Sequence, residues 1–313
     1  MARFLTLTPN PAVDVTYRVT HQRIGETMRV SEVRRAPGGK GINVARALHA
    51  LGRDVTSLQP LGGASGSWVA DALTKRGIPV LDCAIAGETR TTVAIVDDIV
   101  HPTLLAEPGP TLSPAEWSHL GLALADAARA GDWLVIAGSF PHGSRPEDLA
   151  LLIAAAHSKG ALVAVDTSGP FLWTAVASRA DLVKANEEEV VEATGERDCW
   201  TGARSLSQEG ACVMVSRGAL GSILVRADGY LHEQPAVPDI SGNPTGAGDA
   251  ATAGLVAAFA EGLSDSTALR WAALCGAAAV LNPIAGEIDV GLLPELSQRL
   301  GPTPPNPSKR SST

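Results

Sequence analysis

The chain has 313 residues and a net charge of −8, and 45% of its residues are hydrophobic while 19% are charged. This length allows one large α/β domain or two smaller ones, and the acidic balance argues against general nucleic-acid binding. Since no apolar run is long enough to cross a bilayer and the N-terminal segment is too short for a signal peptide, we expect a cytoplasmic protein without a membrane partner.

Short apolar runs bounded by turn residues alternate along the chain with alanine-rich helical stretches. This pattern predicts an α/β fold whose mostly parallel central sheet is covered by helices on both faces. We expect strands at 4–7, 133–137, 161–165, 181–184, 212–216 and 222–226. We expect helices at 41–51, 67–76, 114–130, 146–159, 250–259 and 266–281.

Two segments depart from this alternation, 13–36 and 89–105. Both are strand-like and rich in charge and Thr, and neither has a helix between its strands. We expect them to pair into a small second layer over the edge of the main sheet. The alternative is a pair of long surface loops, which compact domains seldom contain without a functional reason. The proline- and serine-rich tail at 302–313 is expected to be disordered.

Charge and cysteine placement add two expectations. Residues 1–53 hold nine Arg or Lys against three Asp or Glu, which indicates a site for a small anion or, alternatively, a solvated basic surface. The four cysteines show no metal-ligand spacing and have no partnering His cluster. We therefore expect ordinary buried thiols in a reducing compartment at Cys83, Cys199, Cys212 and Cys275.

A glycine-rich turn, Gly38-Gly39-Lys40-Gly41, enters the first expected helix, and Asn43 lies just inside that helix. The turn lacks the Gly-Lys-Ser/Thr of a P-loop and the glycine spacing of a dinucleotide fingerprint. It lets a ligand approach the backbone closely, and Asn43 provides a side-chain amide. Asp14, which follows the first strand, adds a carboxylate. This set suits polyol recognition, whereas the alternative interpretation makes Asp14 and Asn43 turn or cap residues.

Polar residues also follow other expected strands, at the edge where parallel α/β sheets bind ligands. Ser139 follows the strand at 133–137, and its hydroxyl could reach a substrate there. Asn186 and Glu189 follow the strand at 181–184 and could hold a hydrated Mg²⁺, or could form a solvated acidic helix start. The segment 216–221 joins two expected strands and could equally be a plain hairpin turn.

The run Asn243-Pro244-Thr245-Gly246-Ala247-Gly248-Asp249 leads into a helix of small residues. Glycines at such a junction let backbone N–H groups converge, and the positive end of the helix attracts phosphate. A carboxylate there would repel that ligand, so Asp249 is expected to take a proton from a hydroxyl that attacks the phosphate. The alternative is that Asp249 caps the helix.

From about residue 3 to 300 the chain resembles the ribokinase-like (PfkB) carbohydrate kinases. The segment 38–52 is similar to the first signature of that family, and 243–256 fits the second at every restricted position. The hexose-phosphate kinase branch is favoured over ribokinase and adenosine kinase. This branch, which holds 1-phosphofructokinase, tagatose-6-phosphate kinase and the minor 6-phosphofructokinase, is matched by 7–14, 38–41, 87–90, 107–110 and 166–169.

The resemblance implies a ribokinase-like three-layer sandwich in which 1–301 forms a single kinase domain. The segments 13–36 and 89–105 would supply a small β-sheet lid that doubles as a homodimer interface. ATP and Mg²⁺ would be the cofactors, with the ion held, through water, by Asn186 and Glu189. The nucleotide would contact Lys184, Asn186, Ser216, Gly218, Gly221 and Asn282.

The resemblance also implies that Asp249 is the catalytic base and that Gly246, Ala247 and Gly248 form an anion hole. Arg90 would bind the phosphate already on the sugar, and Arg29 looks like an arginine that reaches across the dimer. The full sugar-phosphate site would comprise Asp14, Arg29, Gly38, Gly39, Lys40, Asn43, Arg90 and Ser139.

The sequence departs from the family pattern at a few positions. Ala185 replaces a usual proline, and Asn243 stands where the ribokinase side has Asp, which places a monovalent-cation effect in doubt. Thr27 occupies the place of a phosphate-binding lysine of the minor 6-phosphofructokinase, whereas Lys40 occupies a glycine position of that enzyme. This exchange favours the 1-phosphofructokinase or tagatose-6-phosphate kinase pattern.

The sequence therefore predicts an ATP-dependent kinase that converts fructose 1-phosphate to fructose 1,6-bisphosphate. A 6-phosphofructokinase or tagatose-6-phosphate kinase acting at C1 stays open as an alternative. A non-catalytic sugar-phosphate sensor is disfavoured by the intact Asp249 and its glycines, and a nucleotide-dependent oxidoreductase is disfavoured by the missing dinucleotide fingerprint.

Overall fold

The computed structural model describes residues 2–99, 102–282, 284 and 286–302. The predicted disordered tail lies, apart from its first residue, outside the described residues. Within those ranges no helix is long and apolar enough to span a membrane.

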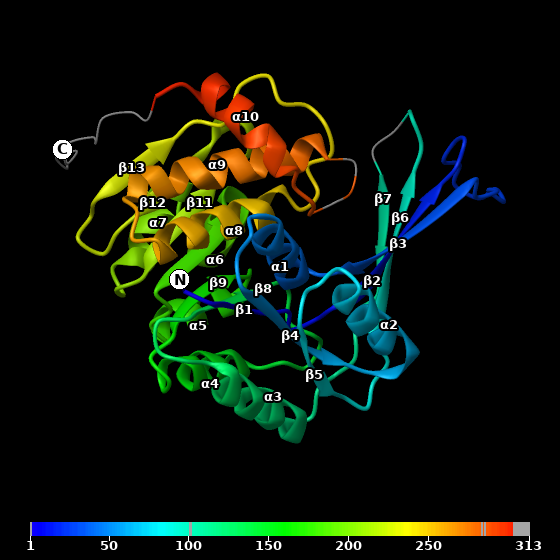
Figure 1. The fold of residues 1–313 in the computed structure, drawn as a ribbon, viewed down its shortest axis with the longest axis horizontal. Coiled ribbons are helices and arrows are strands. Elements are labelled where there is room, and N and C mark those ends of the chain that lie inside the picture. Colours follow the sequence, from blue (N-terminus) through cyan, green and yellow to red (C-terminus); the bar gives the residue numbers. More distant parts are fainter. Residues whose placement is uncertain (1, 100–101, 283, 285, 303–313) are drawn as a thin grey trace.

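A nine-stranded sheet forms the centre of the molecule, in the order β13-β12-β11-β10-β9-β8-β1-β4-β5 (Figure 1). All pairs from β5 to β11 are parallel, and only the edge pairs β11–β12 and β12–β13 are antiparallel. The strands are β1 (Phe4–Leu7), β4 (Val55–Leu61), β5 (Val80–Ala84), β8 (Trp133–Ala137), β9 (Leu162–Asp166), β10 (Leu182–Asn186), β11 (Cys212–Ser216), β12 (Ser222–Val225) and β13 (Leu231–Gln234).

Helices cover both faces of this sheet, so the predicted three-layer α/β sandwich is confirmed (Figure 1). Side chains alternate between the two faces, as in Phe4 against Leu5 and Leu7 of β1, and they build two separate cores. One core is shared with α1 (Lys40–Ala50), α2 (Gly63–Thr74), α8 (Ala247–Ala260), α9 (Asp265–Leu281) and α10 (Leu293–Leu300). The other is shared with α3 (Pro114–Ala127), α4 (Pro146–His157), α5 (Pro170–Ala177), α6 (Glu187–Thr194) and α7 (Cys199–Ser207).

A second sheet of four strands stands beside the main one, in the order β3-β2-β6-β7 (Figure 1, right). Its strands are β2 (Ala12–Arg18), β3 (Glu32–Gly38), β6 (Arg90–Val96) and β7 (Thr103–Ala106). The prediction of a small second layer is confirmed, and the alternative of long surface loops is wrong. Strands β2 and β6 pair in parallel, which joins the two segments that the sequence set apart.

Element boundaries differ from the sequence expectations by a few residues, for local reasons. Helix α2 begins at Gly63 rather than at residue 67, because the carboxylate of Glu88 accepts a hydrogen bond from the Ser65 amide at 2.7 Å and caps the first turn. Helix α3 ends at Ala127 rather than at residue 130, because Ala128 has an extended backbone. The four cysteines are buried free thiols, as predicted.

Candidate active site

The predicted site residues gather at the carboxyl-terminal edge of the central sheet, next to the four-stranded sheet. Ser139 follows β8, Asn186 and Ser216 end β10 and β11, and these strands lie close together in the sheet. Open α/β sheets bind ligands at this edge, because the loops there are free to diverge. Strand β1 leads at the same edge toward the turn that precedes Asp14.

Asp249 lies in the first turn of α8 and is only 6% exposed. The helix starts from Gly246, whose left-handed backbone (φ 81°) suits glycine and turns the chain into the helix without a side-chain cap. The Asp249 Oδ2 atom instead accepts a hydrogen bond of 2.8 Å from Nδ2 of Asn43 in α1. The helix-cap interpretation of Asp249 is therefore wrong, and its carboxylate faces the glycine-rich turn of the first motif.

Burial raises the pKa of Asp249 to about 6, and the nearby charge of Asp166 acts in the same direction. The Asn43 hydrogen bond and the ammonium groups of Lys184 and Lys40 oppose this shift. A carboxylate with this pKa is mostly ionised at neutral pH and is a stronger proton acceptor than an exposed aspartate.

Asp166, at the end of β9, is a site residue to which the sequence assigned no role. It is fully buried, and its two oxygens bind different lysines: Oδ1 accepts from Nζ of Lys40 at 3.0 Å, and Oδ2 from Nζ of Lys184 at 2.9 Å. Thr252 in α8 also donates to Oδ2, at 3.2 Å. The signal in the sequence was its position, since Asp166 directly follows the strand expected at 161–165, at the ligand-binding edge of the sheet.

The two lysines supply positive charge at the amino end of α8. A Cβ on Gly248 would lie 3.0 Å from Nζ of Lys184, so this ammonium group stands directly beside the predicted anion hole. Burial alone would raise the pKa of Asp166, but Lys184 and Lys40 outweigh it and lower that pKa below its usual value. The charge of Asp166 in turn raises the pKa of Lys40 against the effect of burial. Two fixed cations and a helix N-terminus together form a site for an anion.

The structure brings together Asp14, Gly38 and Arg90, three residues of the predicted sugar-phosphate site. The Asp14 carboxylate packs against the α-carbon of Gly38, where any Cβ would collide with it. Burial raises the pKa of Asp14 to about 6, although the charges of Arg90 and Arg46 lower it. The Arg90 guanidinium donates to the carbonyl oxygens of Asn10 (3.2 Å) and Glu107 (3.0 Å), so backbone groups fix its direction.

Two further residues of the predicted sugar site differ in placement. Ser139 is exposed and follows Gly138, whose α-carbon faces Lys40: a Cβ on Gly138 would lie 3.8 Å from Cβ of Lys40. Arg29 is exposed in the segment between β2 and β3. The four-stranded sheet therefore carries Arg29, whereas Ser139 belongs to the central sheet.

The predicted nucleotide residues, apart from Asn282, lie in or next to the ends of β10 and β11. Asn186 and Glu189 form a reciprocal capping box at the start of α6, with both side-chain-to-amide hydrogen bonds at 2.8 Å, as the helix-start interpretation proposed. The turn at 216–221 is a hairpin between β11 and β12, in which a Cβ on Gly221 would collide with the carbonyl oxygen of Gln234. Asn282 ends α9 and accepts a hydrogen bond from the Ile284 amide at 2.9 Å.

The described residues include no group of three or more His, Cys, Asp or Glu that could hold a metal ion. The capping box occupies Oδ1 of Asn186 and Oε2 of Glu189, while Oε1 of Glu189 lies 3.7 Å from Nζ of Lys40. These donors fit an ion that keeps its waters and takes its direct ligands from phosphate, which is the usual behaviour of Mg²⁺.

A cavity of about 630 Å³ lies at the opposite edge of the central sheet, near the amino ends of β8 to β11. Trp133, Leu182 and Cys212 line it, and none of the predicted site residues does. The titratable cluster around Asp249, rather than this cavity, marks the candidate active site.

Known proteins share this architecture and much of this sequence. The model of the pfkB family of carbohydrate kinases matches residues 8–289. A 1-phosphofructokinase of Rhodobacter capsulatus is 37% identical over 90% of this chain and 92% of its own length. An ATP-dependent 6-phosphofructokinase isozyme 2 of Mycobacterium tuberculosis is 32% identical over 90% of this chain and 85% of its own length. A crystal structure of phosphofructokinase-2 from Escherichia coli in complex with potassium superposes with a TM-score of 0.90 at 29% identity, covering 96% of this chain and 100% of the other.

The family match spans most of the chain and includes the segments that carry Asp14, Asn43, Asp166 and Asp249. A carbohydrate kinase needs an anion site and a proton acceptor close together, and the cluster at the amino end of α8 holds a buried carboxylate beside two ammonium groups. The chain belongs to the pfkB family of carbohydrate kinases, phosphotransferases that use an alcohol group as acceptor.

Proposed function

We propose that this kinase transfers the γ-phosphoryl group of ATP to the C6 hydroxyl of fructose 1-phosphate, which yields fructose 1,6-bisphosphate and ADP. The observation that carries the proposal is the seating of Asp249 as a buried carboxylate at the amino end of α8, beside Lys184. The name of the Rhodobacter capsulatus relative supports fructose 1-phosphate as the acceptor.

The transfer forms a bond between the sugar C6 oxygen and the γ-phosphorus and breaks the bond between that phosphorus and the β–γ bridging oxygen. The hydroxyl proton passes to Asp249, and ADP leaves with the electron pair of the broken bond. The amides of Gly246 and Gly248 would face the charge that develops on the moving group, joined by that of Ala247, which donates to the Pro244 carbonyl oxygen at 3.1 Å before the ligand binds. This fixed electrostatic stabilisation is the largest contribution that a protein makes to such a reaction.

Arg90 is proposed to bind the phosphate already present on the sugar. Its guanidinium is half-buried and directed by backbone carbonyls rather than neutralised by a carboxylate hydrogen bond, so it keeps charge for a ligand. Asp14 and Asn43 would accept and donate hydrogen bonds to the sugar hydroxyls, and Gly38 and Gly39 would admit the ring close to the backbone. Lys40 at the start of α1 and Ser139 after β8 would complete the contact.

ATP is proposed to lie along the ends of β10 and β11, over Lys184, Asn186, Ser216, Gly218 and Gly221, with its base near Asn282. The hydrated Mg²⁺ would be held through water by Asn186 and Glu189. When bound, the ion would neutralise phosphate charge. The role proposed for Lys184 does not depend on the ion, because Asp166 holds the Lys184 ammonium group beside Gly248.

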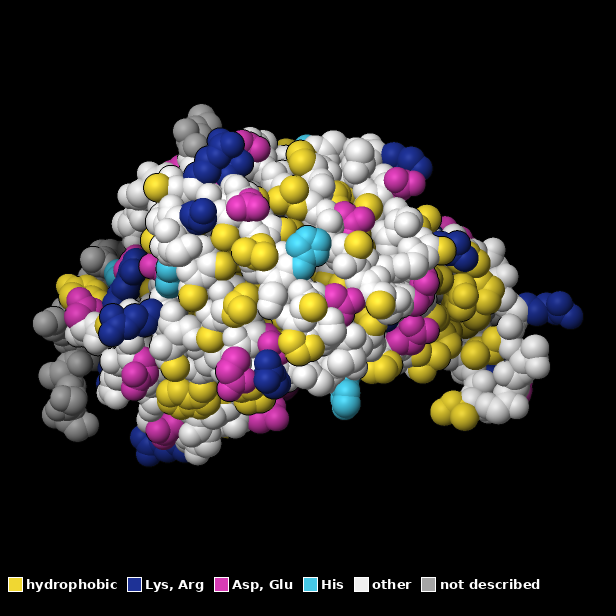
Figure 2. Space-filling model, turned by 90° about the horizontal axis from the view of Figure 1, so that it is seen from below, with side chains coloured by type: hydrophobic (Ala, Val, Ile, Leu, Met, Phe, Trp, Pro, Cys, Tyr) yellow, Lys and Arg dark blue, Asp and Glu magenta, His cyan; other side chains and the backbone are white. Residues whose placement is uncertain are grey.

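The four-stranded sheet is proposed to close over the sugar and to form a homodimer interface. Its hydrophobic residues Val33, Leu104 and Leu105 are 53%, 61% and 56% exposed, with Leu104 on one face of the sheet and Val33 and Leu105 on the other. Figure 2 shows hydrophobic side chains gathered at this end of the molecule. Exposed apolar surface of this kind marks an interaction site. Arg29 on the same sheet would then reach the phosphate site of the partner chain.

The test is a comparison of kcat/KM for fructose 1-phosphate, fructose 6-phosphate, tagatose 6-phosphate and fructose, with MgATP and coupled detection of ADP. The proposal expects fructose 1-phosphate to be used most efficiently. A preference for fructose 6-phosphate would support the alternative that the Mycobacterium tuberculosis relative represents, 6-phosphofructokinase activity. Efficient use of unphosphorylated fructose would contradict the roles of Arg90 and Arg29. If no sugar caused ADP release, the kinase proposal would be wrong and the non-catalytic sugar-phosphate sensor would be supported instead.

A further inference from the structure

The hydrogen bond between Asn43 and Asp249 is one link in a longer chain of contacts. Arg46, one turn further along α1, donates from Nη1 to Oδ1 of Asn43 at 3.3 Å and from Nη2 to Oε1 of Glu287 at 2.6 Å. Glu287 follows α9, so the chain of contacts joins segments that are far apart in the sequence. Three successive hydrogen bonds thus lead from Glu287 to Asp249.

We propose that Arg46 and Glu287 are positioning residues for the catalytic base: Glu287 holds the Arg46 guanidinium, Arg46 orients the Asn43 amide, and Asn43 orients Asp249. The inference rests on the proposed role of Asp249 as the base. Neither Arg46 nor Glu287 touches the sugar or the nucleotide in the proposed reaction, so their effect on Asp249 would pass through Asn43, while the charge of Arg46 also lowers the pKa of Asp14.

The chemistry of the amide explains why an arginine is needed. Asn43 has an acceptor at Oδ1 and donors at Nδ2, and the carboxylate of Asp249 accepts only from the donor end. A guanidinium on Oδ1 allows one orientation, because a rotated amide would place its oxygen against the carboxylate and its NH₂ against the cation. Arg46 therefore keeps Nδ2 of Asn43 directed at the Asp249 carboxylate, so that this hydrogen bond is present in every turnover.

Packing holds the same amide from another side. Gly286 has a left-handed backbone (φ 70°), and a Cβ there would lie 2.5 Å from Cγ of Asn43. The Gly286 amide also donates to the carbonyl oxygen of Thr245, in the loop that leads to Gly246, at 3.4 Å. The segment that carries Glu287 is thus seated on Asn43 and tied to the proposed anion hole.

Arg46 occupies this position at an electrostatic cost. Its side chain is 4% exposed, and burial lowers its pKa, while the hydrogen bond and the charge of Glu287 oppose that shift. A buried charge costs free energy unless it is well paired, and pairing one with a half-buried carboxylate contributes little net stability. A contribution to catalysis accounts for keeping the ion pair beside Asn43.

The test compares the pH dependence of kcat for Arg46→Met and Glu287→Gln with that of the parent enzyme, using fructose 1-phosphate and MgATP. Asp249 must be ionised to act, so kcat falls as the pH falls through its pKa. Loss of the Asn43 hydrogen bond removes stabilisation of the ionised form. We expect the acid limb to move up by about one pH unit and kcat at its plateau to fall about tenfold, while KM for ATP stays unchanged.

The pair of variants separates positioning from simple charge effects. The charged groups that face Asp249 are Asp14, Asp166, Lys40 and Lys184, and both variants keep them. If only charge mattered, loss of the Arg46 cation would move the acid limb up, and loss of the Glu287 anion would move it down. Positioning instead predicts an upward shift in both variants: Arg46→Met removes the donor to Oδ1 of Asn43, and Glu287→Gln weakens the hydrogen bond that holds Arg46, so each one loosens the Asn43 amide. A downward shift in Glu287→Gln would overturn the proposal.

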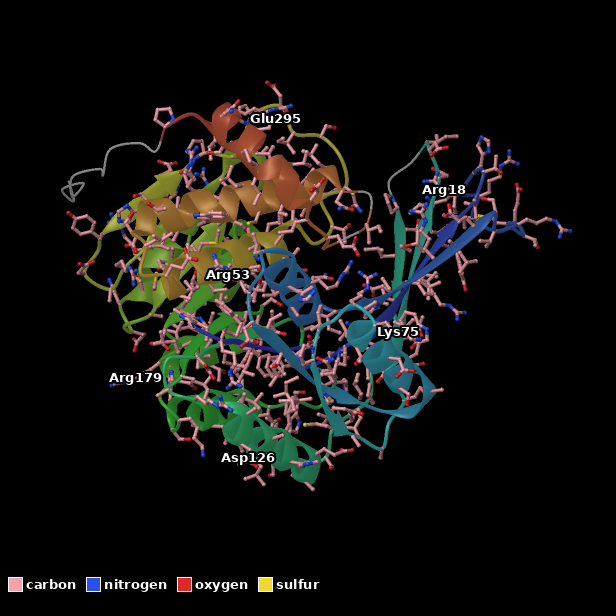
Figure 3. The ribbon with its side chains drawn as sticks, viewed as in Figure 1. Arg18, Arg53, Lys75, Asp126, Arg179 and Glu295 are labelled. Atoms are coloured by element: carbon pink, nitrogen blue, oxygen red, sulfur yellow. The ribbon has the colours of Figure 1, made fainter. Side chains whose placement is uncertain are left out.

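Arg53→Met is the matched control. Arg53, labelled in Figure 3, follows α1 and pairs with Glu261 at the end of α8, so it is also an arginine in an ion pair near these helices. Its variant should keep the parent pH profile, and the same shift there would overturn the proposal. Glu287 is more exposed than Arg46, so Glu287→Gln keeps the test decisive if Arg46→Met does not fold.

Asp249→Asn separates failure of this inference from failure of the proposed function. If that variant loses turnover while Glu287→Gln keeps the parent acid limb, only the positioning role is wrong. If Asp249→Asn keeps near-normal turnover, Asp249 is not the base, and the positioning role falls with it.

Discussion

At the scale of single residues, burial makes Asp249 a stronger proton acceptor but lowers the stability of the folded protein at neutral pH. Burial raises the pKa of this carboxylate from the ordinary aspartate value of 3.8 to about 6. In the folded state it therefore binds a proton more readily than in the unfolded state. Between about pH 4 and 6 the folded state holds more protons, so this residue makes the protein less stable as the pH rises through that window.

We expect Asp249→Asn to lower kcat by about 10²–10⁴-fold, because it removes the proton acceptor but keeps the shape of the side chain. The same change should stabilise the protein at pH 8 by about 1–3 kcal/mol and have little effect at pH 4, since a pKa shift of one unit corresponds to about 1.4 kcal/mol. Urea denaturation of the parent and the variant at both pH values measures this difference. An equal effect at pH 4 and pH 8 would contradict the raised pKa.

At the scale of elements, the junction of β3 and α1 sets the sugar side of the site. Gly38 ends β3 and leaves room for the Asp14 carboxylate on the paired strand β2. A methyl group at this position would have to displace that carboxylate, because no free space separates the two.

We expect Gly38→Ala to raise KM for the sugar phosphate about tenfold or more and to leave KM for ATP unchanged, because one displaced hydrogen-bonding group costs about 1.4 kcal/mol or more. Steady-state kinetics with each substrate varied in turn measures both constants. Gly52→Ala is the control, since a Cβ on Gly52 meets nothing within 4 Å, although its left-handed backbone (φ 71°) is also strained by alanine. A rise in both constants for Gly38→Ala would indicate general disruption instead.

Sequence reasoning found most of the elements but not their side-chain partners. The alternation of apolar runs and helices was enough to predict the sandwich, and the Thr-rich strands at 13–36 and 89–105 predicted the second sheet. Asp249 and Asn43 were each singled out, yet the hydrogen bond between them spans 206 positions and depends on how α8 packs beside α1. Asp166 was missed as a site residue because an aspartate at a strand end has many possible uses until its two lysines are seen.

At the scale of the whole molecule, the four-stranded sheet is, among the residues that the structure describes, the part with large exposed apolar side chains on more than one strand. We expect Leu104→Asp to shift the protein from dimer to monomer in light scattering after size-exclusion chromatography, because burying an aspartate in an apolar interface is costly. Leu122→Asp is the control: Leu122 in α3 is 65% exposed, similar to the 61% of Leu104, but lies away from this sheet. A parent protein that is monomeric at micromolar concentration would refute the interface.

The junction between the two sheets has one more consequence. Strand β3 ends at Gly38 and α1 begins at Lys40, so Gly39 is the whole hinge between them. Any tilt of the smaller sheet must therefore rotate the first turn of α1 or be absorbed at this single residue, whose φ is 113°. Because Lys40 is anchored to Asp166, the proposed closure over the sugar would either shift this ammonium group or be taken up entirely by the backbone of Gly39.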